Sequence, residues 1–174
     1  MGWNIGDLMD VLKLRNQSIM YFQQVAYSGS EMHLIPDAEL AALYQISDAF
    51  VLISGEGFGL PTFEAMATKL PCILLDYAAS SELGAEGRAE LVPSAGSLTW
   101  TGSHLTQRPL PEPKDIVQSL LRIFRDRERR NNIAKAGYDF ATKYTWDRVA
   151  NDWDAMFRRH EYPFIGEMKM EVIA

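Results

Sequence analysis

The chain has 174 residues, about the length of one domain, and its 47% hydrophobic and 23% charged residues are typical of a globular protein with a core. Its net charge of −6 disfavours a general nucleic-acid binder, because affinity for a phosphate backbone requires a basic face. The one cysteine, Cys72, excludes a disulfide framework, and no apolar run reaches the roughly 18 residues that a membrane span needs. The first residues lack the basic and apolar regions of a signal peptide, so we expect a cytoplasmic location.

Segments of strand and helix character alternate along the first half of the chain. Apolar residues at helical spacing predict helices, and short apolar runs predict strands. The predicted order is a helix over 7–14, a strand over 19–25, a helix over 37–44, a strand over 49–53, a loop and helix over 55–69, and a strand over 72–75. This alternation predicts a Rossmann-like, doubly wound parallel α/β sheet.

The second half is expected to be irregular at first and then helical. Residues 77–111 contain scattered Pro, Gly and Ser, which favours a mobile loop or an insertion, with a short strand at 90–92. Helices are expected from Pro113 onward, over 128–144 and over 146–159. The apolar faces of the first and third of these helices are expected to consist of Ile116, Val117, Leu120, Leu121 and Phe124, and of Val149, Trp153, Met156 and Phe157.

A loop with three glycines joins the strand at 49–53 to the following helix. Gly55, Gly57 and Gly59 lack a Cβ, so the backbone there can turn sharply and approach a ligand closely. Pro61 suits the first helical position, because its φ is fixed and it has no N–H group. The free N–H groups at the start of the helix and the helix dipole would then form an anion site.

A carboxylate lies at each end of this loop and helix start. Glu56 is in the loop, and Glu64 is about one turn inside the helix, where its side chain leans back toward the helix start. Carboxylates accept hydrogen bonds from sugar hydroxyls. Two of them beside a phosphate site therefore suggest one for the ribose of a nucleotide and one for a second sugar.

Two other phosphate-binding loops can be tested against this sequence. A P-loop requires Gly-Lys-Ser/Thr at the helix start, and the lysine is absent here. A dinucleotide fingerprint requires G-x-G-x-x-G, and its sixth position is Leu60 or Thr62 rather than glycine. Asp76 nevertheless ends the next strand about 20 residues on, where a ribose-binding acid would lie, so a dinucleotide-binding oxidoreductase domain remains an alternative.

The complete string E-G-F-G-L-P-T-F-E-A-M-A, from Glu56 to Ala67, resembles the E-x7-E signature of retaining glycosyltransferases with the two-domain GT-B fold. It is similar in particular to glycosyltransferase family 4. The family usually has glycine where this chain has Lys69, a difference expected to alter the helix C-terminus but not the ligand loop. The resemblance runs through most of the chain, so we expect a nucleotide-sugar-binding domain over residues 1–158 and a tail over 159–174.

The resemblance implies a role for each residue that matches the family pattern. Glu56, as the active-site carboxylate, is expected to hold donor-sugar hydroxyls, and Glu64 to hold the ribose hydroxyls. Transfer in the family retains the anomeric configuration and needs no metal or other cofactor. The remaining expected donor contacts are Gly57, Phe58, Gly59 and Leu60 in the loop, Tyr27 beside the base, and Glu82 after the strand at 72–75.

Two parts of the family's enzymes have no counterpart in this sequence. One is the acceptor domain, and the other is the first strand and helix of the donor domain, which carry an arginine and a lysine that grip the diphosphate. We therefore expect no transfer by this chain alone, and as partners either an acceptor domain, in cis or on another chain, or a second copy of the chain. A non-enzymatic nucleotide-binding or interaction module remains the other alternative.

The other charged residues match no family motif. Arginines at positions 122, 125, 127, 129 and 130 alternate with acids and are expected on a solvated, partly paired surface. His33, His104 and His160 are expected in loops or at the surface.

Overall fold

The computed structural model describes residues 10, 11, 13, 36–100 and 106–159. The chain forms two units, Met1–Leu40 and Ala41–Ala174. The expected helix over 7–14 lies largely outside the described residues, and the strand over 19–25 lies wholly outside them. Tyr27 and the three histidines are outside them as well, so their expected roles stay predictions.

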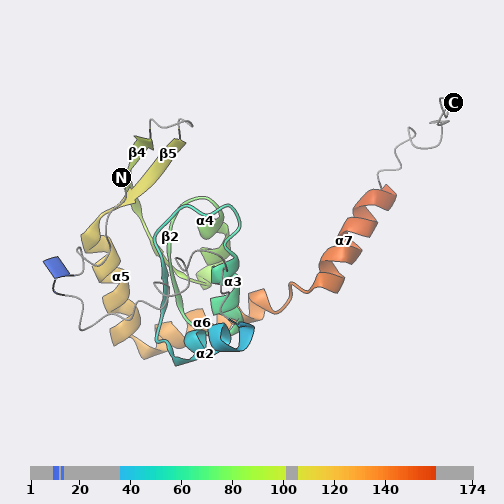
Figure 1. The fold of residues 1–174 in the computed structure, drawn as a ribbon, viewed down its shortest axis with the longest axis horizontal. Helices are drawn as coiled ribbons and strands as arrows, with labels where there is room; N and C mark the ends of the chain where they lie inside the picture. Colours follow the sequence, from blue (N-terminus) through green and yellow to red (C-terminus); the bar gives the residue numbers. More distant parts are fainter. Residues whose placement is uncertain (1–9, 12, 14–35, 101–105, 160–174) are drawn as a thin grey trace, which may run out of the picture. The chain divides into compact units, whose positions relative to one another are not determined.

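A parallel three-stranded sheet forms the centre of the second unit (Figure 1). Its strands are β1 (Phe50–Leu52), β2 (Cys72–Leu75) and β3 (Glu90–Val92), in the order β1-β2-β3. Every residue of β2 is buried, as a run of four apolar residues in a central parallel strand predicts. The three expected strands that fall within the described residues are thus confirmed, and so is the parallel α/β sheet.

Six helices lie in the described part of the chain. Five of them match expected helices to within a few residues, and only α4 was not expected. Their bounds are α2 Asp37–Ile46, α3 Leu60–Ala67, α4 Ala79–Gly84, α5 Pro113–Arg125, α6 Arg127–Ala141 and α7 Trp146–Arg159. A single 3-10 turn, Ala85–Gly87, follows α4.

Strand β2 separates two hydrophobic cores because its side chains alternate between the sheet faces. Cys72 and Leu74 pack with buried residues of α3 and α4 in one core. Ile73 packs in the other core with Ile123 of α5. Helix α6 contributes to both cores, so helices cover both faces of the sheet, which is the doubly wound arrangement expected from the sequence.

The stretch after β2 is more regular than the sequence suggested. Beyond α4 and β3, it forms an antiparallel ribbon of β4 (Ser94–Trp100) and β5 (Thr106–Pro111), with a register irregularity between Ser94 and Gly96 (Figure 1). The expectation of an irregular stretch over 77–111 is therefore wrong. The prolines of β5 are compatible with a strand here because each strand of a two-stranded ribbon has an unpaired edge, where no N–H group is required.

The predicted apolar face of α5 is only partly the face that packs on the sheet. Ser119 and Ile123 are buried, whereas the side chains of Val117, Leu120 and Phe124 are 51%, 41% and 77% exposed. The helix is rotated relative to the expectation because a polar residue, Ser119, belongs to its inner face.

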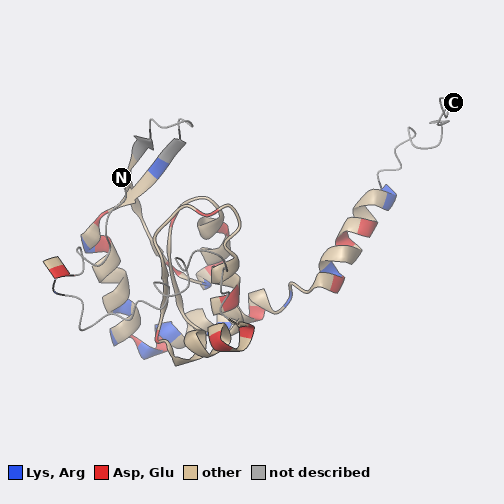
Figure 2. Cartoon of the chain, in the orientation of Figure 1, with Lys and Arg blue, Asp and Glu red and all other residues tan. Residues whose placement is uncertain are grey.

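Helix α7 has the expected bounds and the expected apolar stripe, but that stripe is not buried. Trp153 and Phe157 stack on each other with ring centroids 5.5 Å apart, and both are more than half exposed. Acidic and basic residues alternate with the apolar ones along the helix (Figure 2). In the part of the chain that the structure describes, no helix has both the length and the apolar character needed to cross a membrane.

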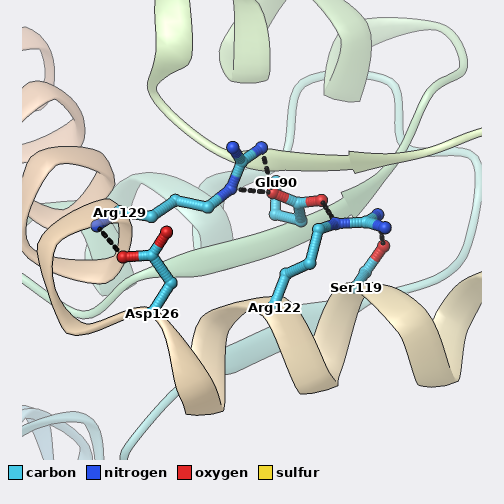
Figure 3. A network of polar contacts seen from close by, with 5 residues as sticks. All are labelled: Glu90, Ser119, Arg122, Asp126 and Arg129. Carbon is cyan, nitrogen blue, oxygen red and sulfur yellow. Dashed lines mark hydrogen bonds and ion pairs between the residues drawn. The ribbon is translucent and has the colours of Figure 1, made fainter.

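A buried carboxylate joins the two helices after the ribbon to the sheet (Figure 3). Glu90 at the start of β3 is 3% exposed, and its two oxygens accept hydrogen bonds from Arg122 Nε at 2.6 Å and from Arg129 Nε at 2.8 Å. Arg122 also donates to Ser119 Oγ, while Asp126 caps α6 by accepting from the Arg129 N–H. Two arginines expected on a solvated surface therefore hold α5 and α6 to β3.

Candidate functional site

The glycine-rich loop after β1 adopts the geometry that its sequence requires. Gly59 precedes α3 with φ +90°, a conformation that glycine adopts without strain, and a Cβ there would lie 3.0 Å from Leu83 Cδ1. The helix begins at Leu60, so Pro61 occupies the second helical position rather than the expected first. The loop thus reaches the helix through a turn that favours glycine at position 59.

The start of α3 offers fewer backbone donors than the sequence suggested. The N–H groups of Thr62 and Phe63 both donate to the Gly59 carbonyl, at 3.0 and 3.2 Å. Within the described part of the chain, the N–H groups of Phe58, Gly59 and Leu60 have no acceptor. These three amides, at the positive end of the helix dipole, form the candidate anion site.

Glu56 lies in an open pocket of about 390 Å³. The carboxylate is partly buried, and its Oε1 accepts a hydrogen bond from Ser54 Oγ at 3.2 Å. The pocket wall consists of three segments, residues 53–57 after β1, Tyr77 and Ala78 after β2, and Arg108 and Pro109 in β5. The first two segments follow the carboxyl ends of neighbouring parallel strands, which is where open α/β sheets bind ligands.

The segment after β2 lies close to the glycine loop and is itself strained. A Cβ at Gly55 would lie 3.1 Å from the ring of Tyr77, so glycine allows the two segments to approach. Ala78 has φ 51° and ψ −136°, a backbone conformation populated mainly by glycine. A strained residue in the wall of a pocket is a feature common at functional sites.

Glu64 does not line the pocket that contains Glu56. Its exposed carboxylate accepts a hydrogen bond of 2.9 Å from the hydroxyl of Tyr44 on α2. Partial burial, and then this hydrogen bond and charge, raise the pKa of Tyr44 well above its ordinary value, so the phenol remains a donor at neutral pH. The structure therefore fixes the orientation of Glu64 but does not bring its carboxylate into the pocket of Glu56.

The other expected site residues are distributed around the loop. Gly57 lines the pocket with Glu56, while Phe58 stacks on Phe63 with ring centroids 5.1 Å apart and remains 58% exposed. Glu82 is exposed on α4, and it does not line the pocket. Of the expected donor contacts that lie within the described residues, the structure brings only Glu56 and Gly57 into one pocket.

Tyr77 and Arg108 line this pocket but were not among the expected site residues. The position of Tyr77, two residues after the strand at 72–75, was a visible signal, because residues there face the ligand crevice. Arg108 carried no signal, since its place in the wall depends on a ribbon that was not expected. Among the described residues, no group of three or more His, Cys, Asp or Glu side chains could hold a metal ion.

The sequence matches the model of one protein family, described as glycosyl transferases group 1, over residues 32–140. That segment is more than half of the chain and includes the loop, α3, the ribbon and most of α6. The chain belongs to the group 1 glycosyltransferases. The resemblance drawn from the Glu56–Ala67 string is thereby confirmed.

Two kinds of relative share this similarity. The serotype-specific mannosyltransferase WbdA of Escherichia coli is 35% identical over 89 residues, which are 49% of this chain and 10% of WbdA. A second WbdA protein of the same species is 34% identical over the same length. The chain thus spans about a tenth of the length of these curated relatives.

A solved structure is also similar, the C-terminal domain of a glycosyl transferase group 1 family protein, LpcC, from Francisella tularensis. It is 24% identical, the match covers 79% of this chain and 63% of that one, and the TM-score is 0.47.

Proposed function

We propose that this group 1 glycosyltransferase chain binds a nucleoside-diphosphate sugar in the pocket of Glu56, as the donor of a retaining glycosyl transfer. The observation that carries the proposal is a partly buried carboxylate directly beside a helix start with three N–H groups that have no acceptor in the described residues. The sugar of such a donor has hydroxyls that can donate to the carboxylate, and its diphosphate has oxygens that can accept from the N–H groups. The matched family supports this donor class.

The donor sugar and phosphate would bind at adjacent points of the loop. Glu56 accepts hydrogen bonds from sugar hydroxyls, with Ser54 holding one of its oxygens. The amides of Phe58, Gly59 and Leu60 donate to phosphate oxygens. As the bond to the sugar breaks, negative charge grows on the departing diphosphate, and fixed N–H dipoles stabilise it without reorganising.

Glu64 would bind the ribose hydroxyls at the outer side of α3. The hydrogen bond from Tyr44 occupies Oε2 and leaves Oε1 to accept from a ribose hydroxyl. A ligand that reaches from Glu56 to Glu64 must extend along the first turns of α3. A nucleotide sugar, with a diphosphate between its two sugars, has such an extended form.

Transfer also needs an acceptor held opposite the donor sugar. Without a surface that orients the acceptor and excludes water, bound donor gains neither proximity nor protection from hydrolysis. We expect another domain or another chain to supply this surface, as the two-domain resemblance implies. This chain alone is then expected to bind donor without transferring sugar.

Calorimetry with UDP, GDP and their sugar nucleotides tests the donor assignment. Glu64→Ala is expected to weaken the nucleoside diphosphate and the sugar nucleotide equally, by roughly 0.5–1.5 kcal/mol for each lost hydrogen bond. Glu56→Ala is expected to weaken only the sugar nucleotide. Glu128→Ala, an exposed acid on α6 outside the pocket, is the matched control.

Two outcomes would contradict the proposal. Equal losses for both ligands in both variants would remove the division of roles between Glu56 and Glu64. Binding of NAD without binding of any nucleotide sugar would favour the oxidoreductase alternative instead. Light scattering and a transferase assay, with and without candidate acceptor-domain partners, test whether a second chain completes the enzyme.

A further inference from the structure

We propose that Arg108, on strand β5 of the ribbon, binds the donor diphosphate, so that the ribbon is part of the donor site. The proposal rests on the function proposed above and adds a contact that the loop sequence does not contain. It follows from where the ribbon starts, from the charges in the pocket wall and from the chemistry of arginine.

The topology explains how a residue 52 positions after Glu56 reaches the same pocket. Strand β3 runs parallel to β1 and β2, so all three end at one edge of the sheet. Strand β4 begins at Ser94, two residues after the end of β3, so the ribbon grows from that edge. Strand β5 returns along β4, with Arg108 opposite Leu98, and places Arg108 and Pro109 in the pocket wall.

The charges in the pocket wall are one acid and one base. Glu56 is the carboxylate and Arg108 the cation, and the other lining residues are uncharged at neutral pH. The Arg108 side chain is exposed, and in the described part of the chain it has no ion-pair partner. Its five N–H donors are therefore available to a ligand, whereas Arg122 and Arg129 already hold Glu90.

The diphosphate is the part of the donor that matches Arg108 best. A guanidinium presents two parallel N–H groups that fit two oxygens of a phosphate. The guanidinium is positively charged and the phosphate negatively charged, so the hydrogen bonds between them are strong. In a nucleoside-diphosphate sugar, one of the two phosphates is bonded directly to the donor sugar. A sugar held by Glu56 therefore places this phosphate next to the pocket that Arg108 lines. The guanidinium and the amides of α3 would then bind the same diphosphate.

Calorimetry on the whole chain with Arg108→Ala, Arg108→Lys and Arg125→Ala tests the contact. Arg125 is an exposed arginine in the last turn of α5 that does not line the pocket. The ligands are UDP and GDP, the corresponding free nucleosides and the sugar nucleotides. Arg108→Ala is expected to weaken the nucleoside diphosphates roughly tenfold or more, because a hydrogen bond to a charged group is lost.

A contact between Arg108 and phosphate predicts three further experimental results. The free nucleosides are expected to bind Arg108→Ala as they bind the unchanged chain, and Arg108→Lys is expected to recover part of the affinity for the diphosphates. The salt dependence of diphosphate binding should become shallower in Arg108→Ala, since one cation fewer meets the phosphate. Circular dichroism confirms that the variant folds, as expected for an exposed side chain.

The outcomes separate this inference from the donor proposal. Unchanged diphosphate affinity in Arg108→Ala overturns the contact while leaving the donor proposal in place. A loss limited to the sugar nucleotides also overturns it, because Arg108 would then serve the sugar. A chain that binds no nucleoside diphosphate at all overturns both.

Discussion

Tyr44 and Glu64 form a hydrogen bond of 2.9 Å between two helices, with the phenol as donor and the carboxylate as acceptor. The ring of Tyr44 also packs edge-on against Phe50 at the start of β1, with centroids 6.1 Å apart. Tyr44 thus has two roles: its hydroxyl orients the Glu64 carboxylate, and its ring packs against the core that contains Cys72 and Leu74.

Tyr44→Phe separates these two roles. The ring packing remains, so we expect a loss of unfolding free energy of only about 1 kcal/mol, the net value of a typical hydrogen bond. Nucleoside diphosphate affinity should fall by a similar amount, because Glu64 loses its fixed orientation. Chemical denaturation and calorimetry measure the two effects, and an unchanged affinity would argue against a ligand role for Glu64.

Much of the fold could be predicted because the deciding residues are local in sequence. The apolar run Cys72–Leu75 predicted a strand, and the glycines before Leu60 predicted a turn into a helix. The inner face of α5 could not be predicted, because Ser119 is buried through its bond to Arg122, which in turn holds Glu90 from a strand 32 residues earlier. The spacing of apolar residues within α5 gives no indication of the contact with Glu90.

The candidate site, like the fold, could be predicted only where its residues are contiguous in sequence. Glu56 and the loop are contiguous, and their chemistry could be inferred from the string alone. Arg108 entered the site through strand pairing between β4 and β5, which places residues by register rather than by motif. The separation of Glu64 from the Glu56 pocket likewise depends on the direction of side chains around α3.

The Glu90 cluster is expected to show strong coupling between its members. In the intact chain, Arg122→Met leaves a buried carboxylate with one partner fewer, and it should be clearly destabilising. In a Glu90→Gln background the same change should cost much less, giving a coupling energy of about 1–3 kcal/mol. A double-mutant cycle by urea denaturation measures this, and additive effects would show that the ion pairs are not coupled.

Ala78→Gly is expected to stabilise the protein. Ala78 has a positive φ that a Cβ disfavours, and relief of this strain should exceed the entropy cost of glycine, for a net gain of about 1 kcal/mol. Ala79→Gly is the matched control, because Ala79 begins α4 and gains nothing from glycine. Thermal unfolding of the unchanged chain and of the two variants measures these effects. A loss of stability in Ala78→Gly would contradict the proposed backbone strain at Ala78.

Gly59→Ala and Gly57→Ala should differ in their effects on stability. Alanine at position 59 must adopt φ near +90° and meets Leu83, which should cost about 1–2 kcal/mol. A Cβ at Gly57 meets nothing within 4 Å, so that change should stay within about 0.5 kcal/mol. Equal denaturation midpoints for the two variants would refute the conformational argument.

Alkaline pH is expected to weaken the fold through Cys72 and Tyr44. Burial raises the pKa of the Cys72 thiol from an ordinary 9.0 to about 12, and the pKa of Tyr44 is raised as well. Both groups ionise first in the unfolded chain. Their contribution is therefore complete below about pH 9 and is lost as pH rises toward the folded values.

Urea denaturation from pH 7 to pH 11 measures this loss. The fall in unfolding free energy above pH 9 should be shallower in Cys72→Ala than in the unchanged chain, by up to about 1.4 kcal/mol per pH unit. Parallel pH profiles for the two proteins would show that Cys72 ionises alike in both states.

The pocket of Glu56 is assembled from segments that lie far apart in the chain, and this has a consequence for folding. The ribbon of β4 and β5 pairs neighbours in sequence and can close early, whereas β1, β2 and β3 must pair in parallel across intervening helices, which is a slow type of contact. Glu56, Tyr77 and Arg108 can therefore meet only after the parallel sheet is complete. A ligand that touches all three would recognise the finished protein alone, so nucleotide binding during refolding would mark the last step rather than an early one.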